Sequence, residues 1–191
     1  MIKFLATINN DDKKLLNSLK GQKFICYEYG QTEDSEEVIL ETEGNMRFHF
    51  ENVTFDLNNK EYEPKDRNND LAWFFIDEIN SSNTFKPYGE GKVAKTIVND
   101  VVSSVEVIQE HALMYDKTTK ELVEDFTADH AIIIKTYSNV YMFYRTYIFD
   151  EFIHVVNHDN FEKVYPLEKA KIDWDNDQEY LDVVTREIIS L

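Results

Sequence analysis

The side chains with the clearest potential for chemistry are three alternating aspartates, Asp173, Asp175 and Asp177. Carboxylates at this spacing begin a calcium-binding loop, in which alternating oxygens converge on one ion. The pattern then fails, because Gln178 stands where such a loop requires glycine and Val184 stands where it requires a bidentate glutamate. We therefore predict that these acids begin a helix, where negative charge is favourable, and that they bind no metal.

His154 and His158 form the second candidate, because two histidines at this spacing on a helix can bind one zinc ion. The residues around them are mostly branched or aromatic, however, and favour a strand. In a strand the two rings would stand about 13 Å apart, at roughly 3.3 Å per residue, which is too far to share an ion. His111 and His130 fall in other predicted strands, so we predict neither a metal site nor a cofactor.

Nucleophilic and phosphate chemistry have no recognisable motif in this chain. It contains no Gly-x-Ser-x-Gly turn, and Gly89 and Gly91 flank an acid instead of forming a phosphate-binding loop. The single cysteine, Cys26, stands in an apolar stretch and is predicted to be a small buried hydrophobe. We predict no catalytic residues, and we keep an enzyme or a small-ligand binder of unknown class as the last alternative.

Charge and composition narrow the choice of partner. The chain has 191 residues, 42% of them hydrophobic, which is enough to bury a core of ordinary size. Its formal net charge of -17 would repel phosphate backbones, so we expect no direct contact with DNA or RNA and consider a basic protein partner more suitable. No apolar run is long enough for a signal peptide or a membrane span, and one cysteine cannot form an internal disulfide. We therefore expect a cytoplasmic protein that does not contact membranes.

Two segments of the chain are similar to each other and indicate an internal repeat. Residues 37–56 align with residues 131–150 without a gap, and the apolar positions of the two segments coincide. The identical pairs are Ile39 with Ile133, Thr42 with Thr136, Asn45 with Asn139, Phe55 with Phe149 and Asp56 with Asp150. We interpret each segment as an antiparallel hairpin that follows a helix.

The predicted fold class is therefore α+β, with two divergent helix-plus-antiparallel-sheet pseudo-repeats that share or stack their sheets in one compact unit. The predicted divisions are residues 1–60 for the first repeat, 61–91 for a packed connector with an apolar island at 71–76, 92–160 for the second repeat, and 161–191 for a C-terminal segment. In that last segment apolar residues recur at helical spacing, and Asn176 and Glu179 could cap a helix start. We favour a C-terminal helix, and a strand is the alternative.

The predicted turns, Gly44-Asn45 and Ser138-Asn139, fix which residues of each hairpin share a face. Positions 46, 48 and 50 of the first hairpin and 140, 142 and 144 of the second are predicted to face the core. The opposite face of the second hairpin is rich in the residue types that are enriched at protein interfaces, and we predict an interaction surface there. Its residues are Tyr141, Phe143, Arg145, Tyr147 and Phe149. The alternatives are internal cover by the 59–91 connector or the C-terminal segment, and a ligand-stacking groove.

The corresponding face of the first hairpin is acidic, and the acidic loop at residues 32–37 adjoins it. We predict a docking patch for a basic partner there, with a plain solvated loop as the simpler interpretation. Its residues are Glu33, Asp34, Glu36, Glu37, Glu41, Glu43 and Glu51.

The function predicted from these features is a non-enzymatic intracellular interaction protein, of the inhibitor or immunity type, that binds another protein through the aromatic face. A homodimer would also fit this prediction. The second candidate is a mimic of nucleic-acid charge that inhibits a DNA- or RNA-binding host protein or a nuclease.

Overall fold

The computed structural model describes residues 2–31, 36–43, 47–56, 70–79, 93–146, 153–174 and 180–191. Within these residues the chain forms ten strands and three short helices. The strands are β1 (Ile2–Ala6), β2 (Lys23–Gln31), β3 (Glu36–Thr42), β4 (Arg47–Asp56), β5 (Asp70–Ile79), β6 (Ala94–Asp116), β7 (Leu122–Thr136), β8 (Val140–Tyr144), β9 (His154–Asn157) and β10 (Tyr180–Ser190). The helices are α1 (Asn10–Asn17), α2 (Phe161–Val164) and α3 (Leu167–Trp174).

The ten strands belong to one sheet in the order β5-β4-β3-β2-β6-β7-β8-β9, to which β1 is added beside β7 and β10 beside β6. The pairing of β1 with β7 is parallel, and the other described pairings are antiparallel. The predicted α+β class is therefore wrong, because the fold is β-rich and its helices are short additions to a sheet. The predicted helix-plus-sheet repeat fails for the same reason.

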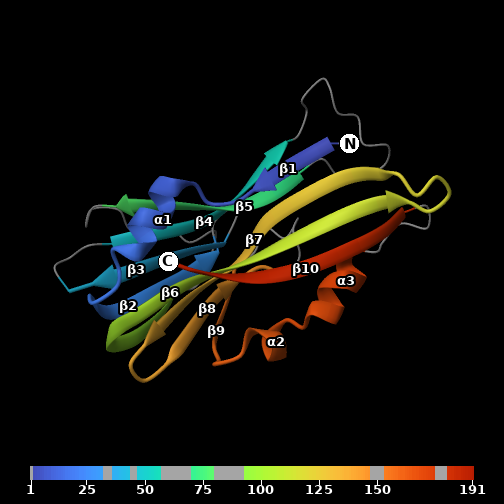
Figure 1. Ribbon diagram of the computed structural model, residues 1–191. Coiled ribbons are helices and arrows are strands. Elements are labelled where there is room, and N and C mark those ends of the chain that lie inside the picture. The colour runs from blue at the N-terminus through green and yellow to red at the C-terminus, as the bar shows by residue number, and fades with distance from the viewer. Residues whose placement is uncertain are drawn as a thin grey trace.

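Strand β6 joins the two halves of the sheet (Figure 1). Along one edge its residues 94–101 pair with β2 and its residues 106–116 pair with β10, while β7 pairs along the other edge. The sequence of β6 is rich in Val and Ile, which favour extended backbone, and the helix predicted to open the second repeat is absent from this strand. The sheet curls so that β5 approaches β1 and β7, and Figure 1 shows β6 and β7 extending together beyond the curled part.

The main core lies within the curl, and α1 closes it on one side. Helix α1 begins at a capping box, in which the Asn9 side chain accepts from the backbone N–H of Asp12 at 3.0 Å and Asp12 accepts from that of Asn9 at 3.1 Å. The main core consists of Ile8, Leu16, Leu19, Phe24, Val38, Leu40, Phe74, Ile76, Val102, Val105, Val107, Ile132, Ile134, Tyr141, Phe143 and Ile153.

A second cluster lies where the α2–α3 segment meets the sheet. Phe161 of α2, Ala170 of α3 and Tyr165, which lies between the two helices, pack with Ile133 of β7 and Met142 of β8. The face of the sheet that carries Met142 is therefore also covered, which leaves β7 and β8 buried on both sides. Among the described residues, no helix combines the length and the apolar character that crossing a membrane would require.

The two predicted hairpins are present as β3–β4 and β7–β8, but their registers differ by one residue. Residues 42–46 separate the pair Glu41 and Arg47, whereas only residues 136–139 separate the pair Lys135 and Val140. A one-residue difference in register exchanges the two faces of a strand. The second hairpin therefore buries in the main core the face that was predicted to be its outer one.

The C-terminal helix prediction is also wrong, because residues 180–190 form β10 and pair with β6 along their whole length. Val183, Val184, Thr185, Ile188 and Ile189 are β-branched, which favours a strand. The strand that had been the alternative is the observed structure. The proposed capping residues Asn176 and Glu179 lie outside the described residues.

Candidate interaction site along strand β10

The aromatic strand that was predicted to form an interaction surface is part of the protein interior. Tyr141 is 5% exposed, and Phe143 and Arg145 are both 0% exposed. Tyr147 and Phe149 lie outside the described residues. A partner at the surface therefore cannot reach the three described side chains without opening the core.

The cover over this strand comes from β2 and from the connector strand β5. The ring of Phe143 meets Tyr27 of β2 edge-on at 5.8 Å between centroids. The guanidinium of Arg145 lies 5.3 Å from the ring of Phe74 in β5, and it donates a hydrogen bond to the carbonyl of Asp129. The apolar island of the connector thus supplies part of the cover, because both Phe74 and Ile76 belong to the main core.

The predicted acidic face is only partly described, and it carries cations as well as acids. Arg47 lies opposite Glu41 in the sheet, and its guanidinium is 3.7 Å from the carboxylate of Glu28. Lys95 of β6 also pairs with Glu28, at 2.9 Å. Of the predicted acids, Glu37 and Glu41 are half-buried and Glu43 is exposed, whereas Glu33 and Asp34 lie outside the described residues and Glu36 and Glu51 are described only by their backbone.

Strand β10 has a free edge. It pairs with β6 on one side, and no other strand in the described ranges pairs with it on the other. Edge strands are commonly protected by proline, a bulge, short length or charged side chains. Strand β10 is 11 residues long, contains neither proline nor glycine and is bulge-free, and its charged residues are Asp182, Arg186 and Glu187. Its side chains Leu181, Val183 and Ile188 are 47%, 44% and 63% exposed. The other long edge strand, β5, is approached by α1 and β1, and helix α3 approaches β10.

The backbone groups of β10 alternate between its two edges. The N–H of Leu191 donates to the carbonyl of Val105 in β6 at 3.1 Å, and the pairing register continues unbroken from there to Tyr180. In an antiparallel ladder successive residues direct their N–H and C=O to opposite edges. The even-numbered residues, among them Val184, Arg186 and Ile188, therefore present their backbone groups to the free edge.

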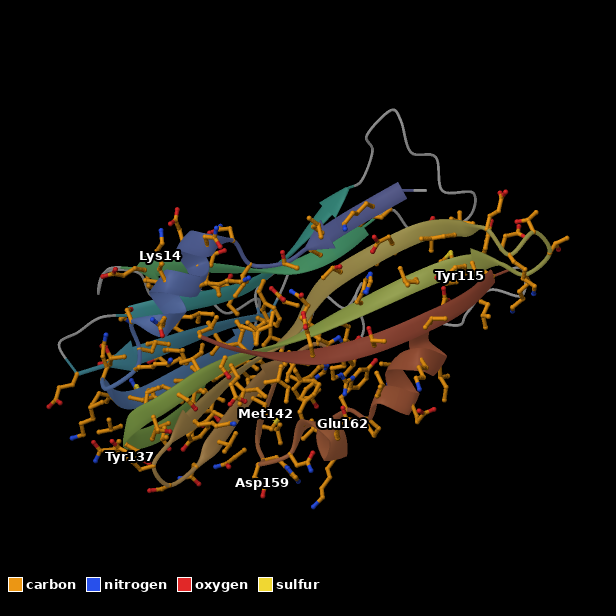
Figure 2. All side chains as sticks on the ribbon, in the orientation of Figure 1. Lys14, Tyr115, Tyr137, Met142, Asp159 and Glu162 are labelled. Carbon is orange, nitrogen blue, oxygen red and sulfur yellow. The ribbon has the colours of Figure 1, made fainter. Side chains whose placement is uncertain are left out.

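A pocket of about 300 Å³ lies beside β10, on the face of the sheet where α2 packs. Its floor is apolar and includes Ile108 of β6, Ile133 of β7 and Met142 of β8, and Ile188 of β10 forms its border on the side of the free edge. Figure 2 shows Met142 together with Asp159 and Glu162 in the part of the molecule where β8, β9 and α2 meet. An apolar floor with a few polar groups around it is typical of a ligand pocket.

The border of this pocket is charged. Lys135 pairs with Glu106 at 2.6 Å on one side, and Arg186 pairs with Glu162 at 2.6 Å on another. Asp159 adds a carboxylate whose side chain is 85% exposed. The carboxylates on the border therefore outnumber the cations.

A buried ionic network underlies the pocket and fixes Arg186. Its guanidinium donates to Glu110 from Nε at 3.0 Å and from Nη2 at 2.5 Å, and to the carbonyl of Tyr165 at 2.7 Å. Nδ1 of His130 lies 3.3 Å from the other carboxylate oxygen of Glu110, and its ring stacks on Tyr165 at 4.5 Å. The side chain of Arg186 is only 5% exposed and that of Glu110 only 2%, so a largely desolvated ion pair joins β10 to β6, and His130 connects it to β7.

The pKa values of Glu110 and His130 depend on the burial of each side chain and on the groups that contact it. Burial tends to raise the pKa of Glu110, but the hydrogen bonds and positive charges of His130 and Arg186 outweigh it and hold the pKa at about 2. Burial lowers the pKa of His130, although Glu110 opposes that change. Nδ1 of His130 faces the ionised Glu110, and Nε2 of His130 is buried with no hydrogen-bond partner among the described residues.

The depressed pKa of Glu110 predicts a specific loss of stability in acid. The ordinary value is 4.5, and a folded value of about 2 means that the contribution of Glu110 is complete above 4.5 and is lost as the pH falls toward 2. The full contribution is about 3 kcal/mol, of which about 2 kcal/mol should be lost by roughly pH 3. Urea unfolding of wild type and Glu110→Gln at about pH 6 and about pH 3 should show the larger acid loss in wild type. Equal losses would contradict an ionised, paired Glu110.

The four histidines whose side chains the structure describes have different neighbours. His111 pairs with Asp125 at 2.7 Å beside a second, polar pocket, His154 lies against Tyr144, and His158 is 3.2 Å from Asp159. Within the described ranges no group of three or more His, Cys, Asp or Glu side chains could hold a metal ion. Asp175 and Asp177 lie outside those ranges.

Sequence reasoning overlooked the network of Glu110, His130 and Arg186 because its members are isolated ionisable residues far apart in the chain. One feature of the sequence nevertheless indicates the buried charge of Glu110. Glu110 falls between Ile108 and Ala112 at the two-residue period of a strand, and an ionisable residue on an otherwise apolar face indicates a buried, paired charge.

No family model, curated protein or solved structure matches the chain.

Proposed function

We propose that this protein binds another protein by adding an extended, basic segment of that partner to the free edge of β10. The observation that carries the proposal is the long edge strand itself, whose outward backbone groups form a template for one more strand. Backbone hydrogen bonds would supply affinity, and the exposed Leu181, Val183 and Ile188 would supply apolar contact on both faces. We further propose that the protein acts in the cytoplasm, as an inhibitor that masks a cationic surface of its target.

Charge favours a basic partner over a second copy of the chain. Two copies would each carry a formal net charge of -17 and would repel one another, whereas the same field attracts a cationic segment. The carboxylates on the pocket border next to β10 also attract a cationic segment. This proposal replaces the buried aromatic strand with β10 as the contact region and keeps the prediction of an interaction protein.

A proline at an outward-facing position of β10 should abolish docking without unfolding the sheet. Ile188 directs its N–H to the free edge, and proline is tolerated on an edge strand when the lost N–H faces outward. The affinity of a capped peptide of alternating lysine and threonine, measured by calorimetry, should fall by about tenfold or more in Ile188→Pro. The control Ile188→Ala keeps the N–H and should stay within about threefold of wild type.

Thermal unfolding should confirm that the Ile188→Pro variant remains folded. The proposal fails if the peptide does not bind wild type, or if the proline and alanine variants bind it equally well. Sedimentation of the free protein gives an independent result, because a dimer that Ile188→Pro dissociates would identify a second copy as the occupant of β10.

The formal net charge favours one further candidate, a mimic of nucleic-acid charge. Such a mimic would bind its target through long-range attraction over a broad surface, with no need for the edge of β10. Its binding would therefore persist in Ile188→Pro and would weaken steeply as salt screens the charges.

A further inference from the structure

We infer that the pocket beside β10 receives a lysine or arginine side chain of the docked partner strand, an inference that rests on the docking proposed above. The pocket would then give specificity for one residue type in the partner, whereas backbone hydrogen bonds alone depend little on the partner's sequence.

The position of the pocket follows the pleat of β10. Arg186 and Ile188 both line it, and both have their backbone groups on the free edge. Residues directly opposite one another in neighbouring strands project from the same face of the sheet. A partner residue placed opposite Ile188 would therefore project on the pocket side, and the 63% exposure of Ile188 leaves that border open.

The floor of the pocket suits the stem of a long side chain. Ile108, Ile133 and Met142 offer an apolar surface, along which the methylene groups of lysine or arginine can pack while the charged end stays near solvent. Such side chains commonly cover apolar surface in this way. A short polar side chain would leave the floor unfilled.

The border of the pocket suits a positive charge at the end of that stem. The carboxylates of Glu106, Asp159 and Glu162 lie on the border, and the cations of Lys135 and Arg186 are already paired. Arg186 is shared between Glu162 and the buried Glu110, so its single charge does not neutralise both. An incoming ammonium or guanidinium would offset the remaining negative charge, whereas a carboxylate would be repelled.

A peptide series tests the inference separately from the docking. We would compare the lysine–threonine peptide with a version in which norleucine replaces lysine, which keeps the stem and removes the charge. Glu162→Gln should weaken the lysine peptide by about threefold to tenfold and leave the norleucine peptide unchanged. The matched control is Glu168→Gln on α3, because Glu168 is 81% exposed, pairs with Lys171 and is not among the pocket residues. It removes the same unit of charge and should change neither affinity.

The readout that locates the side chain is the methyl signal of Met142, which should shift when the lysine peptide binds. If both peptides bind at β10 with equal affinity and Glu162→Gln has no specific effect, the pocket inference is overturned while the docking stands. If Glu168→Gln weakens the lysine peptide as much as Glu162→Gln does, only the overall charge matters and the inference is again overturned. If neither peptide binds wild type, the proposed function itself fails.

Discussion

Replacing Phe143 with alanine is expected to lower the free energy of unfolding by about 3–5 kcal/mol. The ring is 0% exposed and packs edge-on against Tyr27, so its removal leaves a cavity in the main core that the surrounding strands can fill only in part. Urea unfolding followed by circular dichroism measures the change.

The control for this prediction is Tyr137→Ala in the turn of the same hairpin. Tyr137 is an aromatic residue with 78% exposure, and its replacement should change the free energy of unfolding by about 0.5 kcal/mol or less. Equal stability of the two variants would mean that Phe143 is not buried. The face that carries Phe143 would then again be available to a partner.

The second large effect is expected for Arg186→Met, which should lower the free energy of unfolding by about 3–5 kcal/mol at neutral pH. The substitution keeps an apolar side chain of similar length but leaves the carboxylate of Glu110 buried without the guanidinium that donates to it. The cost therefore arises from an uncompensated charge more than from lost packing.

A double variant separates these two causes. Arg186→Met combined with Glu110→Met removes both charges, and it should be more stable than Arg186→Met alone because no buried carboxylate remains. An exposed pair provides the control, since Lys171→Met, which breaks the Lys171–Glu168 pair on α3, should leave the urea midpoint essentially unchanged. A double variant that is no more stable than the single one would contradict a buried ion pair as the source of the effect.

Local patterns in the sequence predicted the hairpins correctly. The alternation in residues 37–56 and 131–150 and the polar breaks between their strands correspond to β3–β4 and β7–β8, although β8 ends at Tyr144. These features depend on residues that are close in the chain, where turn chemistry and two-residue periodicity are direct physical signals.

The faces of the second hairpin could not be predicted from those patterns. The alignment of the two segments assumed loops of equal length between the last paired residues, but the second loop is one residue shorter. That single difference moved Tyr141 and Phe143 into the main core and Met142 into the cluster with Phe161. Strands β7 and β8 are covered on both faces, so apolar residues at successive positions are expected there whichever face a residue occupies.

The C-terminal strand and the buried ion pair depend on pairing between residues that are far apart in the chain. Leu181, Val184, Ile188 and Leu191 have helical spacing, yet residues 180–190 form a strand because β6 offers them an edge along their whole length. The ion pair of Glu110 and Arg186 depends on the same pairing, since the two residues lie opposite one another across β6 and β10. Neither contact has a signal within a short stretch of sequence.

Hydrogen exchange of the β10 amides tests the central claim most directly, because it reports on each backbone N–H separately. In the free protein the outward amides of Val184, Arg186 and Ile188 should exchange faster than the inward amides of Val183, Thr185 and Glu187, which face β6. Addition of the lysine–threonine peptide should slow the three outward amides specifically. Binding of the peptide with no change at these amides would contradict strand addition at β10.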